Sequence, residues 1–468
     1  MAQKTVVLYP SLGVGHLNPM VELAKVFLRR GLAVVIAVVD SPDKDAVSAD
    51  AVARLAAANP DIALRFLPVP PCGADHHDSL PVIRITEVLR LANPALRDFL
   101  RALPAVHALV LDMFCTDALD VAAELAVPAY FFFASPLGDL AIMLHLPFYY
   151  PTAASSFKDM PETVLRFPGV PPIRALDMVT SVQDRESDVS RARQRQCARM
   201  LEARGIFVNT FDWLEARALE ALRCGLCTPG HSMPPLHCIG PLVHVIGNTG
   251  GSGETHACLE WLDAQPDRSV VFLSFGSLGV FSAAQLKEMA RGLENAGHRF
   301  LWVVRTPPEH QNDHSIEPDL ESLLPEGFLE RTRESGFVAK NWAPQIDVLR
   351  HKAIGAFVTH CGWNSALEGI VSGVPMICWP LYAEQRMNKV HMVKEMRIGV
   401  VVEGYEDELV RAEEVEAKVR LVMESDEGNK LRERLVMAKE IGEDALKESG
   451  SSDVAFDEFL RDLENKRT

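Results

Sequence analysis

The strongest constraint on the fold is a regular alternation of short apolar runs with amphipathic segments, which begins near the first residue. "TVVLYP" (residues 5–10) is rich in β-branched residues and predicts a strand, and "SLGVGH" (11–16) is a glycine-bearing loop. A helix is predicted next, with Asn18 as its N-cap and Pro19 at its first position. "LAVVIAVVD" (32–40) is a continuous apolar strand of the kind buried on both faces. This βαβ unit predicts a parallel sheet.

The alternation stops once and then starts again, which predicts two α/β domains. The break is a glycine-rich segment without a regular period, so residues 241–255 are predicted to be a linker. Beyond it comes a strand, "SVVFLSFGS". A helix follows that is capped by Ser282, with Gln285 in the capping-box position, and that is predicted to end at Gly297. We therefore expect an N-terminal domain at 1–240 and a second α/β domain at 256–450.

Composition and charge exclude some classes of function. The formal net charge is −16 and no cluster of lysine or arginine is present, which argues against a nucleic-acid partner. The N-terminus lacks the pattern of a signal peptide, so a cytoplasmic protein is expected. The apolar stretch 127–151 is long enough to span a bilayer but is interrupted by prolines, Asp139 and His145. It is predicted to be a buried strand and a core helix, with no membrane span.

The nine cysteines are odd in number and scattered, which is typical of free thiols in a cytosolic protein. One alternative is a zinc site in "CGLCTPGHSMPPLHC", formed by Cys224, Cys227, His231, His237 and Cys238. Only one C-x-x-C pair is present, and a second suitably spaced pair of ligands is lacking. A loop is therefore the favoured interpretation of this segment.

The most informative short motif is "HCGWNS", at residues 360–365, directly after an apolar strand. Gly362 allows a sharp turn, and Asn364 or Ser365 is predicted to cap the helix "SALEGIVS", which Gly373 is predicted to end. In open parallel sheets, ligands bind at the carboxyl ends of the strands. A helix N-terminus there presents backbone N–H groups to an anion, which indicates a phosphate site. Taken alone, such a motif is far more often an ordinary capped helix than a phosphate site.

The longer segment from Trp342 to Gln385 decides between these interpretations. It begins with W-x-P-Q, contains H-C-G-W-N-S followed by a glutamate, and ends in glutamine. In length and in these residues it resembles the nucleotide-sugar signature of the plant UDP-dependent glycosyltransferases of small molecules. The N-terminal "GVGHLNP" is similar as well, so the resemblance spans nearly the whole chain. It implies two facing Rossmann-like domains in the GT-B architecture, with a C-terminal helix at 451–468 packing back toward the N-terminal domain.

The resemblance also implies roles for single residues. Trp342 stacks on uracil, while Ala343 and Gln345 contact the base and the ribose. Glu368 accepts hydrogen bonds from the ribose hydroxyls. The implied diphosphate and sugar contacts are Ser277, His360, Asn364 and Ser365 for the diphosphate, and Trp363, Glu384 and Gln385 for the sugar.

On the acceptor side, His16 is the implied general base, since an imidazole can take a proton from a hydroxyl at neutral pH. Asp112, at the end of "LVLD", is its implied partner, and Asp117 and Asp120 are weaker candidates. The implied reaction is an inverting transfer of a hexose, glucose in the first place, from a UDP-sugar to a small phenolic acceptor. No Asp-x-Asp-type metal site is evident, so the reaction is expected to need no metal. No other cofactor is expected, and UDP-glucose or another UDP-hexose is the co-substrate.

The acceptor is expected to be a flavonoid and the protein a monomer. Galactose transfer and C-glycosylation stay open as alternatives. Two alternatives belong to other classes. The first is an NAD-dependent dehydrogenase, because "GVGHLN" followed later by Asp40 mimics a dinucleotide fingerprint. The second is a UDP-sugar-binding protein without catalysis, although both His16 and Asp112 are present.

Overall fold

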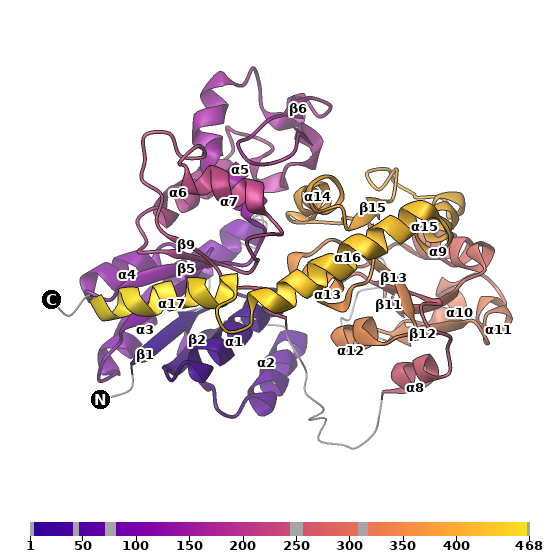
Figure 1. The fold of residues 1–468 in the computed structure, drawn as a ribbon, viewed down its shortest axis with the longest axis horizontal. Coiled ribbons are helices and arrows are strands. Elements are labelled where there is room, and N and C mark those ends of the chain that lie inside the picture. The colour runs from indigo at the N-terminus through magenta and orange to yellow at the C-terminus, as the bar shows by residue number, and fades with distance from the viewer. Residues whose placement is uncertain (1–3, 41–45, 71–80, 244–255, 308–316, 466–468) are drawn as a thin grey trace. The chain divides into compact units, whose positions relative to one another are not determined.

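The computed structural model describes residues 4–40, 46–70, 81–243, 256–307 and 317–465 (Figure 1). It divides into two compact units, Met1–His244 with Gly442–Thr468, and Val245–Ile441. Each unit contains one parallel sheet, which confirms the predicted pair of α/β domains. Most of the predicted linker lies outside the described residues. The later boundary falls inside a helix, at 441/442, whereas the sequence analysis placed it after residue 450.

The first unit is built on a seven-stranded parallel sheet with the order β3-β2-β1-β4-β5-β8-β9. Its strands are β1 (Thr5–Tyr9), β2 (Ala33–Asp40), β3 (Ala63–Pro68), β4 (Ala108–Asp112), β5 (Ala129–Phe133), β8 (Ile206–Val208) and β9 (Leu236–Cys238). The helices of this unit are α1 (Val14–Arg29), α2 (Ala46–Ala58), α3 (Pro81–Ala102), α4 (Ala118–Glu124), α5 (Leu137–Tyr149), α6 (Asp188–Met200), α7 (Ala216–Arg223) and α17 (Ser451–Glu464). Shorter elements are η2 (Tyr150–Thr152), η3 (Phe157–Asp159), η4 (Ala175–Asp177), η5 (Thr180–Val182) and the antiparallel pair β6 (Val164–Leu165) and β7 (Ile173–Arg174).

The second unit is built on a six-stranded parallel sheet with the order β12-β11-β10-β13-β14-β15. Its strands are β10 (Val270–Ser274), β11 (Arg299–Val304), β12 (Gly336–Lys340), β13 (Ile354–Thr359), β14 (Met376–Cys378) and β15 (Gly399–Val401). Its helices are α8 (Ala257–Asp263), α9 (Ala283–Ala296), α10 (Leu320–Leu323), α11 (Phe328–Arg331), α12 (Gln345–Arg350), α13 (Trp363–Ser372), α14 (Gln385–Val390), the π-helix η7 (His391–Met396) and α15 (Ala412–Glu424). The long helix α16 (Asp426–Ala445) crosses the boundary between the units.

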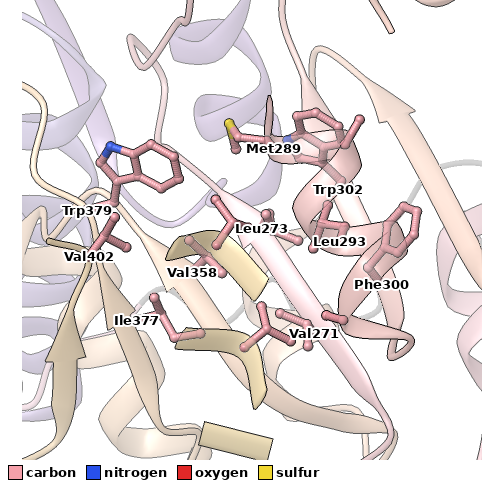
Figure 2. Close-up of a cluster of buried hydrophobic side chains, with 14 of the residues drawn as sticks. Val271, Leu273, Met289, Leu293, Phe300, Trp302, Val358, Ile377, Trp379 and Val402 are labelled. Atoms are coloured by element: carbon pink, nitrogen blue, oxygen red, sulfur yellow. The ribbon is translucent and has the colours of Figure 1, made fainter. Parts of the chain in front are cut away.

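The core of the second unit is a cluster of side chains from the sheet and from the helices that cover it, with Trp302 and Trp379 among its largest members (Figure 2). Helix α9 covers part of this sheet, and Gly297 ends it in a left-handed conformation, as predicted. At its start, Ser282 accepts from the backbone N–H of Gln285. The Gln285 side chain pairs instead with the backbone of Val410, so only half of the predicted capping box forms.

Helix α1 begins earlier than the sequence suggested. Its first residue is Val14, so the predicted N-cap Asn18 and Pro19 both lie inside the helix. Gly13 takes a φ of +90°, which glycine tolerates and which allows the chain to turn into the helix at once. Its carbonyl accepts from the N–H groups of His16 and Leu17, both at 3.2 Å. His16 therefore stands on the first helical turn and not in a loop.

The apolar stretch 127–151 forms β5 and the largely buried helix α5, as predicted. Within the described part of the chain, no helix is both long and apolar enough to cross a bilayer. Helix α17 packs beside β9 (Figure 1). Its Phe456 and Phe459 lie in the core of the first unit. Ser452 Oγ also donates to the carbonyl of Gly240, at 2.6 Å. Helix α17 thus packs on the N-terminal domain, as the resemblance implied.

Candidate active site

The strand orders locate the ligand-binding ends of both sheets. In the first sheet β1 lies between β2 and β4, so the chain leaves β1 on one side and returns on the other. In the second sheet β10 occupies the same position between β11 and β13. Ligands bind in the crevice at such switch points, beyond the carboxyl ends of the strands. The turn after β1 leads to His16, β4 ends at Asp112, and the turns after β10 and β13 carry Ser277 and His360.

His16 and Asp112 form a close pair in the first unit. His16 Nδ1 lies 2.8 Å from Asp112 Oδ2, and the aspartate side chain is fully buried. The backbone N–H of Phe114 donates to the other carboxylate oxygen at 3.0 Å. The Phe114 ring meets the imidazole edge to face, with 5.3 Å between the ring centroids. Asp112 therefore fixes the Nδ1 side of the imidazole, and the backbone N–H of Phe114 fixes the carboxylate.

The weaker candidates, Asp117 and Asp120, are engaged elsewhere. Both lie near Arg199, whose Nη2 is 2.6 Å from Asp120 Oδ1 and whose Nη1 is 3.6 Å from Asp117 Oδ1. Of the three aspartates considered from the sequence, only Asp112 contacts His16.

In the second unit, the turns after β10 and β13 meet at the ring of His360. A methyl group at Gly276 would lie 2.5 Å from His360 Nε2, and one at Gly362 would lie 2.6 Å from the same atom. Two glycines thus let the backbone close around the imidazole. The ring is buried, and its Nδ1 has no hydrogen-bond partner among the described residues.

Burial lowers the pKa of His360 to about 4, and the positive charge of Arg305 contributes to the shift. The ring is therefore neutral near pH 7. A neutral imidazole carries one N–H and can donate a hydrogen bond to an anionic oxygen. A buried ring nitrogen without a partner is an uncommon feature, and it fits a phosphate oxygen at this position.

Helix α13 starts at Trp363, with Gly362 as its N-cap and no side-chain cap. The prediction that Asn364 or Ser365 caps the helix was wrong, because both lie within its first turn. The glycine turn makes a capping side chain unnecessary, as at α1. Trp363 is only 2% exposed and packs in the core. The first turn of α13, with the partial positive charge of a helix N-terminus, follows directly on His360.

A chain of polar contacts joins α12 to α13. Gln345 Nε2 donates to Ser365 Oγ at 2.9 Å and to Glu368 Oε2 at 2.6 Å. Three predicted site residues therefore lie together. Just before α12, Trp342 is 54% exposed, an unusual position for the largest aromatic side chain, whereas Ala343 is buried. The indole and the His256 ring form a T-shaped pair, with 5.6 Å between the centroids.

Glu384 and Gln385 lie at the start of α14. Gln385 is buried, and its Oε1 accepts from the backbone N–H groups of Leu381 and Tyr382 at 2.9 and 3.0 Å. Glu384 Oε1 accepts from Asn388, at 3.4 Å. The amide oxygen of Gln385 thus holds the turn before α14.

Comparison with known proteins shows the family. A family model described as "UDP-glucoronosyl and UDP-glucosyl transferase" matches residues 228–430. The "Anthocyanidin 5,3-O-glucosyltransferase" of a Rosa hybrid cultivar is 41% identical over 466 residues, which are 97% of each chain. The chain belongs to the UDP-glycosyltransferase family. The transferase is thus an enzyme, and this assignment replaces the dehydrogenase alternative.

Solved structures of other transferases support the fold. A UDP-glucosyltransferase from Polygonum tinctorium, described as capable of glucosylating indoxyl, matches with a TM-score of 0.89 at 36% identity and covers 99% of each chain. A Phytolacca americana enzyme in complex with UDP-2-fluoro-glucose and pterostilbene matches with a TM-score of 0.86 at 35% identity, again over 99% of each chain. The transferase therefore has the GT-B fold.

One charged residue of this transferase near the second switch point was missed by the sequence analysis. Arg305 directly follows β11, and its Nη1 donates to the carbonyl of Ser277 at 2.7 Å. Burial lowers its pKa, yet it keeps its positive charge at neutral pH because a guanidinium titrates far above that range. No local motif marks this arginine, so only the arrangement of strands brings it to the site.

The zinc alternative for residues 224–238 finds no support. The part of the chain that the structure describes contains no group of three or more histidine, cysteine or acidic side chains that could hold a metal ion. Cys227 and Cys238 are buried free thiols, and burial raises the pKa of Cys227 to about 12.

Proposed function

We propose that this transferase moves a glucosyl group from UDP-glucose to a hydroxyl of a small phenolic acceptor, a flavonoid in the first place, with inversion at the anomeric carbon. The observation that carries the proposal is the 2.8 Å contact between His16 and the buried Asp112 at the switch point of the first sheet. We also propose that the protein acts as a monomer in the cytoplasm.

In this proposal His16 is the general base. With its Nδ1–H donated to Asp112, the neutral imidazole has its lone pair on Nε2. Nε2 takes the proton of the acceptor hydroxyl as the oxygen attacks the anomeric carbon. Asp112 holds this tautomer and stabilises the imidazolium that forms, as in other His–Asp pairs.

The second unit binds UDP-glucose and stabilises UDP as it leaves. The exposed indole of Trp342 stacks on uracil, with Ala343 and Gln345 beside it, and Glu368 accepts from the ribose hydroxyls. The first turn of α13, the neutral His360 and Ser277 face the diphosphate, and Arg305 adds a fixed positive charge nearby. As the new bond to carbon forms, the bond to the phosphate oxygen breaks and UDP leaves with that electron pair. The proposed contacts of the glucosyl group are Trp363, Glu384 and Gln385.

Two relatives support the choice of substrates. The Rosa enzyme is named for glucosylation of an anthocyanidin, which is a flavonoid. The Phytolacca enzyme was solved with a fluorinated analogue of UDP-glucose and with pterostilbene, a phenol.

The test is a transfer assay with purified protein. UDP-glucose or UDP-galactose is offered with a panel of flavonoids, simple phenols and terpenoid alcohols, in the presence of EDTA, and the products are identified by mass spectrometry and NMR. We expect a flavonoid that gains one hexose from UDP-glucose in a β-linkage. An α-linked product would contradict inversion, and loss of activity with EDTA would contradict metal independence.

Matched variants separate the proposed base pair from the rest of the protein. Asp112→Asn should lower kcat sharply, whereas Asp120→Asn, an exposed aspartate paired with Arg199, should leave kcat unchanged. If no phenol, flavonoid or alcohol accepts a hexose from either donor, the proposed function is wrong.

A further inference from the structure

Helix α6 turns a polar face toward the interior of the first unit. Among its buried residues are Ser190, Arg193 and Gln196, each at most 8% exposed. The spacing of three residues places these side chains along one face of the helix. A buried helix face is normally apolar, and arginine is almost never fully buried unless it is paired.

Arg193 has no ion-pair partner among the described residues. Among those residues its one hydrogen-bond partner is Gln196 on the same helix, whose Oε1 accepts from Nη1. Its Nε and the Nε2 of Gln196 are both buried without a hydrogen-bond partner. The two side chains therefore present a positive charge and at least two N–H donors that nothing in the described protein accepts. A buried charge without a partner is strongly unfavourable, so an acceptor is expected at this position.

The guanidinium lies close to the proposed base. Its carbon lies 4.9 Å from the centroid of the Phe114 ring. The imidazole of His16 lies 5.3 Å from the same centroid. Among the described residues Asp112 forms no ion pair with the arginine; its two oxygens accept from His16 and from the Phe114 backbone. Arg193, which has no ion-pair partner among the described residues, and His16 of the proposed catalytic pair thus both contact the ring of Phe114.

We propose that Arg193, together with Gln196, binds an anionic oxygen of the acceptor, so that the enzyme favours aromatic acceptors that carry a carboxylate in addition to the hydroxyl that is attacked. The proposal rests on the proposed function, since it places a second contact on the acceptor whose hydroxyl His16 deprotonates. A carboxylate matches both the charge and the fork of donors of a guanidinium.

The selectivity follows from the state of the free protein. A neutral acceptor leaves the buried charge uncompensated, as it already is before binding. A carboxylate removes that unfavourable state, and charge-assisted hydrogen bonds in a site shielded from water are strong. Binding of the anion should therefore exceed binding of an uncharged analogue of the same shape.

The test compares p-coumarate with methyl p-coumarate, which has the same phenol and lacks the negative charge. Each is measured as an inhibitor of glucosyl transfer to a neutral phenol that the enzyme accepts, so the result does not depend on whether the probe is itself glucosylated. We expect p-coumarate to have an inhibition constant roughly 10- to 100-fold below that of its ester, the range of one charge-assisted contact. Arg193→Gln should abolish this difference and leave the constant for the ester unchanged.

Two further variants serve as controls. Arg191→Gln removes an arginine from the same helix that is half exposed and paired with Asp188, and it should retain the wild-type preference. Arg193→Lys keeps the charge without the planar fork, so it should retain part of the preference, and it serves if Arg193→Gln does not fold. Circular dichroism and thermal unfolding report the folded state of each variant.

The remaining outcomes would overturn the proposal. These are an ester that inhibits as strongly as the acid in the wild type, no inhibition by either probe, or a preference for the acid that persists in Arg193→Gln. Equal weakening of both probes in Arg193→Gln would assign Arg193 a purely structural role. If the wild type transfers no sugar to any phenol, the proposed function itself fails, whereas transfer without preference for the acid contradicts only this inference.

Discussion

The buried imidazole of His360 predicts a specific dependence of stability on pH. Burial, with a smaller contribution from Arg305, lowers its pKa to about 4, compared with about 6.5 for a histidine in an unfolded chain. Between these values the unfolded chain takes up a proton that the folded chain does not. The stability is therefore complete above the unfolded pKa and is lost as the pH falls toward the folded pKa.

The size of the effect follows from the same shift. A change from about 6.5 to about 4 removes roughly 2 kcal/mol of unfolding free energy between pH 7 and pH 5, and roughly 3 kcal/mol by pH 4. Every other titrating group contributes as well, so the wild type is compared with His360→Asn. The variant lacks the ionisable ring. Its unfolding free energy should therefore fall by roughly 2 kcal/mol less than that of the wild type between pH 7 and pH 5, and by roughly 3 kcal/mol less by pH 4.

Urea unfolding followed by tryptophan fluorescence measures this difference in the relevant unit. Five of the six tryptophans, all except Trp213, belong to the second unit. His298→Asn is a matched control, because it removes a partly exposed histidine that pairs with Glu424 in the same unit. If the wild type and His360→Asn lose stability in parallel from pH 7 to pH 5, the ring is not held neutral, and its assignment as a neutral donor to the diphosphate is wrong.

Further variants test the proposed roles one by one. His16→Ala should lower kcat by roughly 10²- to 10⁴-fold, as for a lost general base, while calorimetry shows unchanged UDP affinity. Unchanged turnover would remove His16 from the mechanism. Trp342→Ala should weaken UDP binding by roughly 5- to 100-fold, the range for one base stacked on an aromatic ring, and undiminished affinity in calorimetry would contradict stacking. Gly276→Ala should weaken UDP binding and lower the melting temperature, because its methyl group would lie 2.5 Å from His360 Nε2 and its φ is +73°; a variant with wild-type affinity and melting temperature would show that the turn is less crowded.

The architecture could be predicted because the signals for it are local. Continuous apolar runs with a helical pattern between them indicate buried parallel strands and their crossovers, and the structure has these elements in both units. Gly297 and Gly373 were correctly assigned as helix ends, since each takes the left-handed conformation. The helix starts were wrong where a glycine replaced a side-chain cap, at α1 and at α13. Side-chain caps leave a pattern in the sequence, and a glycine turn leaves almost none.

Contacts between distant segments account for what the sequence did not reveal. The side chain of Gln285 pairs with Val410, which is 125 residues away, although the local pattern favoured Ser282. Arg305 and Arg193 look like ordinary surface arginines in the sequence, because one ends a strand and the other lies on a polar helix. The sheet order places Arg305 beside Ser277, and the packing of α6 places Arg193 beside Phe114. Local sequence patterns do not reveal such contacts.

The position of Gln385 changes how donor selectivity should be interpreted. The resemblance treats this residue as a sugar contact, so a substitution there would be expected to affect binding of the sugar alone. Here its Oε1 also accepts from the backbone of Leu381 and Tyr382. The Tyr382 ring in turn lies 6.1 Å from the ring of His360, between centroids. A substitution at 385 would therefore alter the turn that carries Tyr382, next to the proposed diphosphate site, as well as any contact with the sugar. A change of donor preference in a variant at position 385 should therefore be interpreted together with its affinity for UDP. UDP lacks the sugar, so a change in UDP affinity reports an effect on the turn and not on a sugar contact.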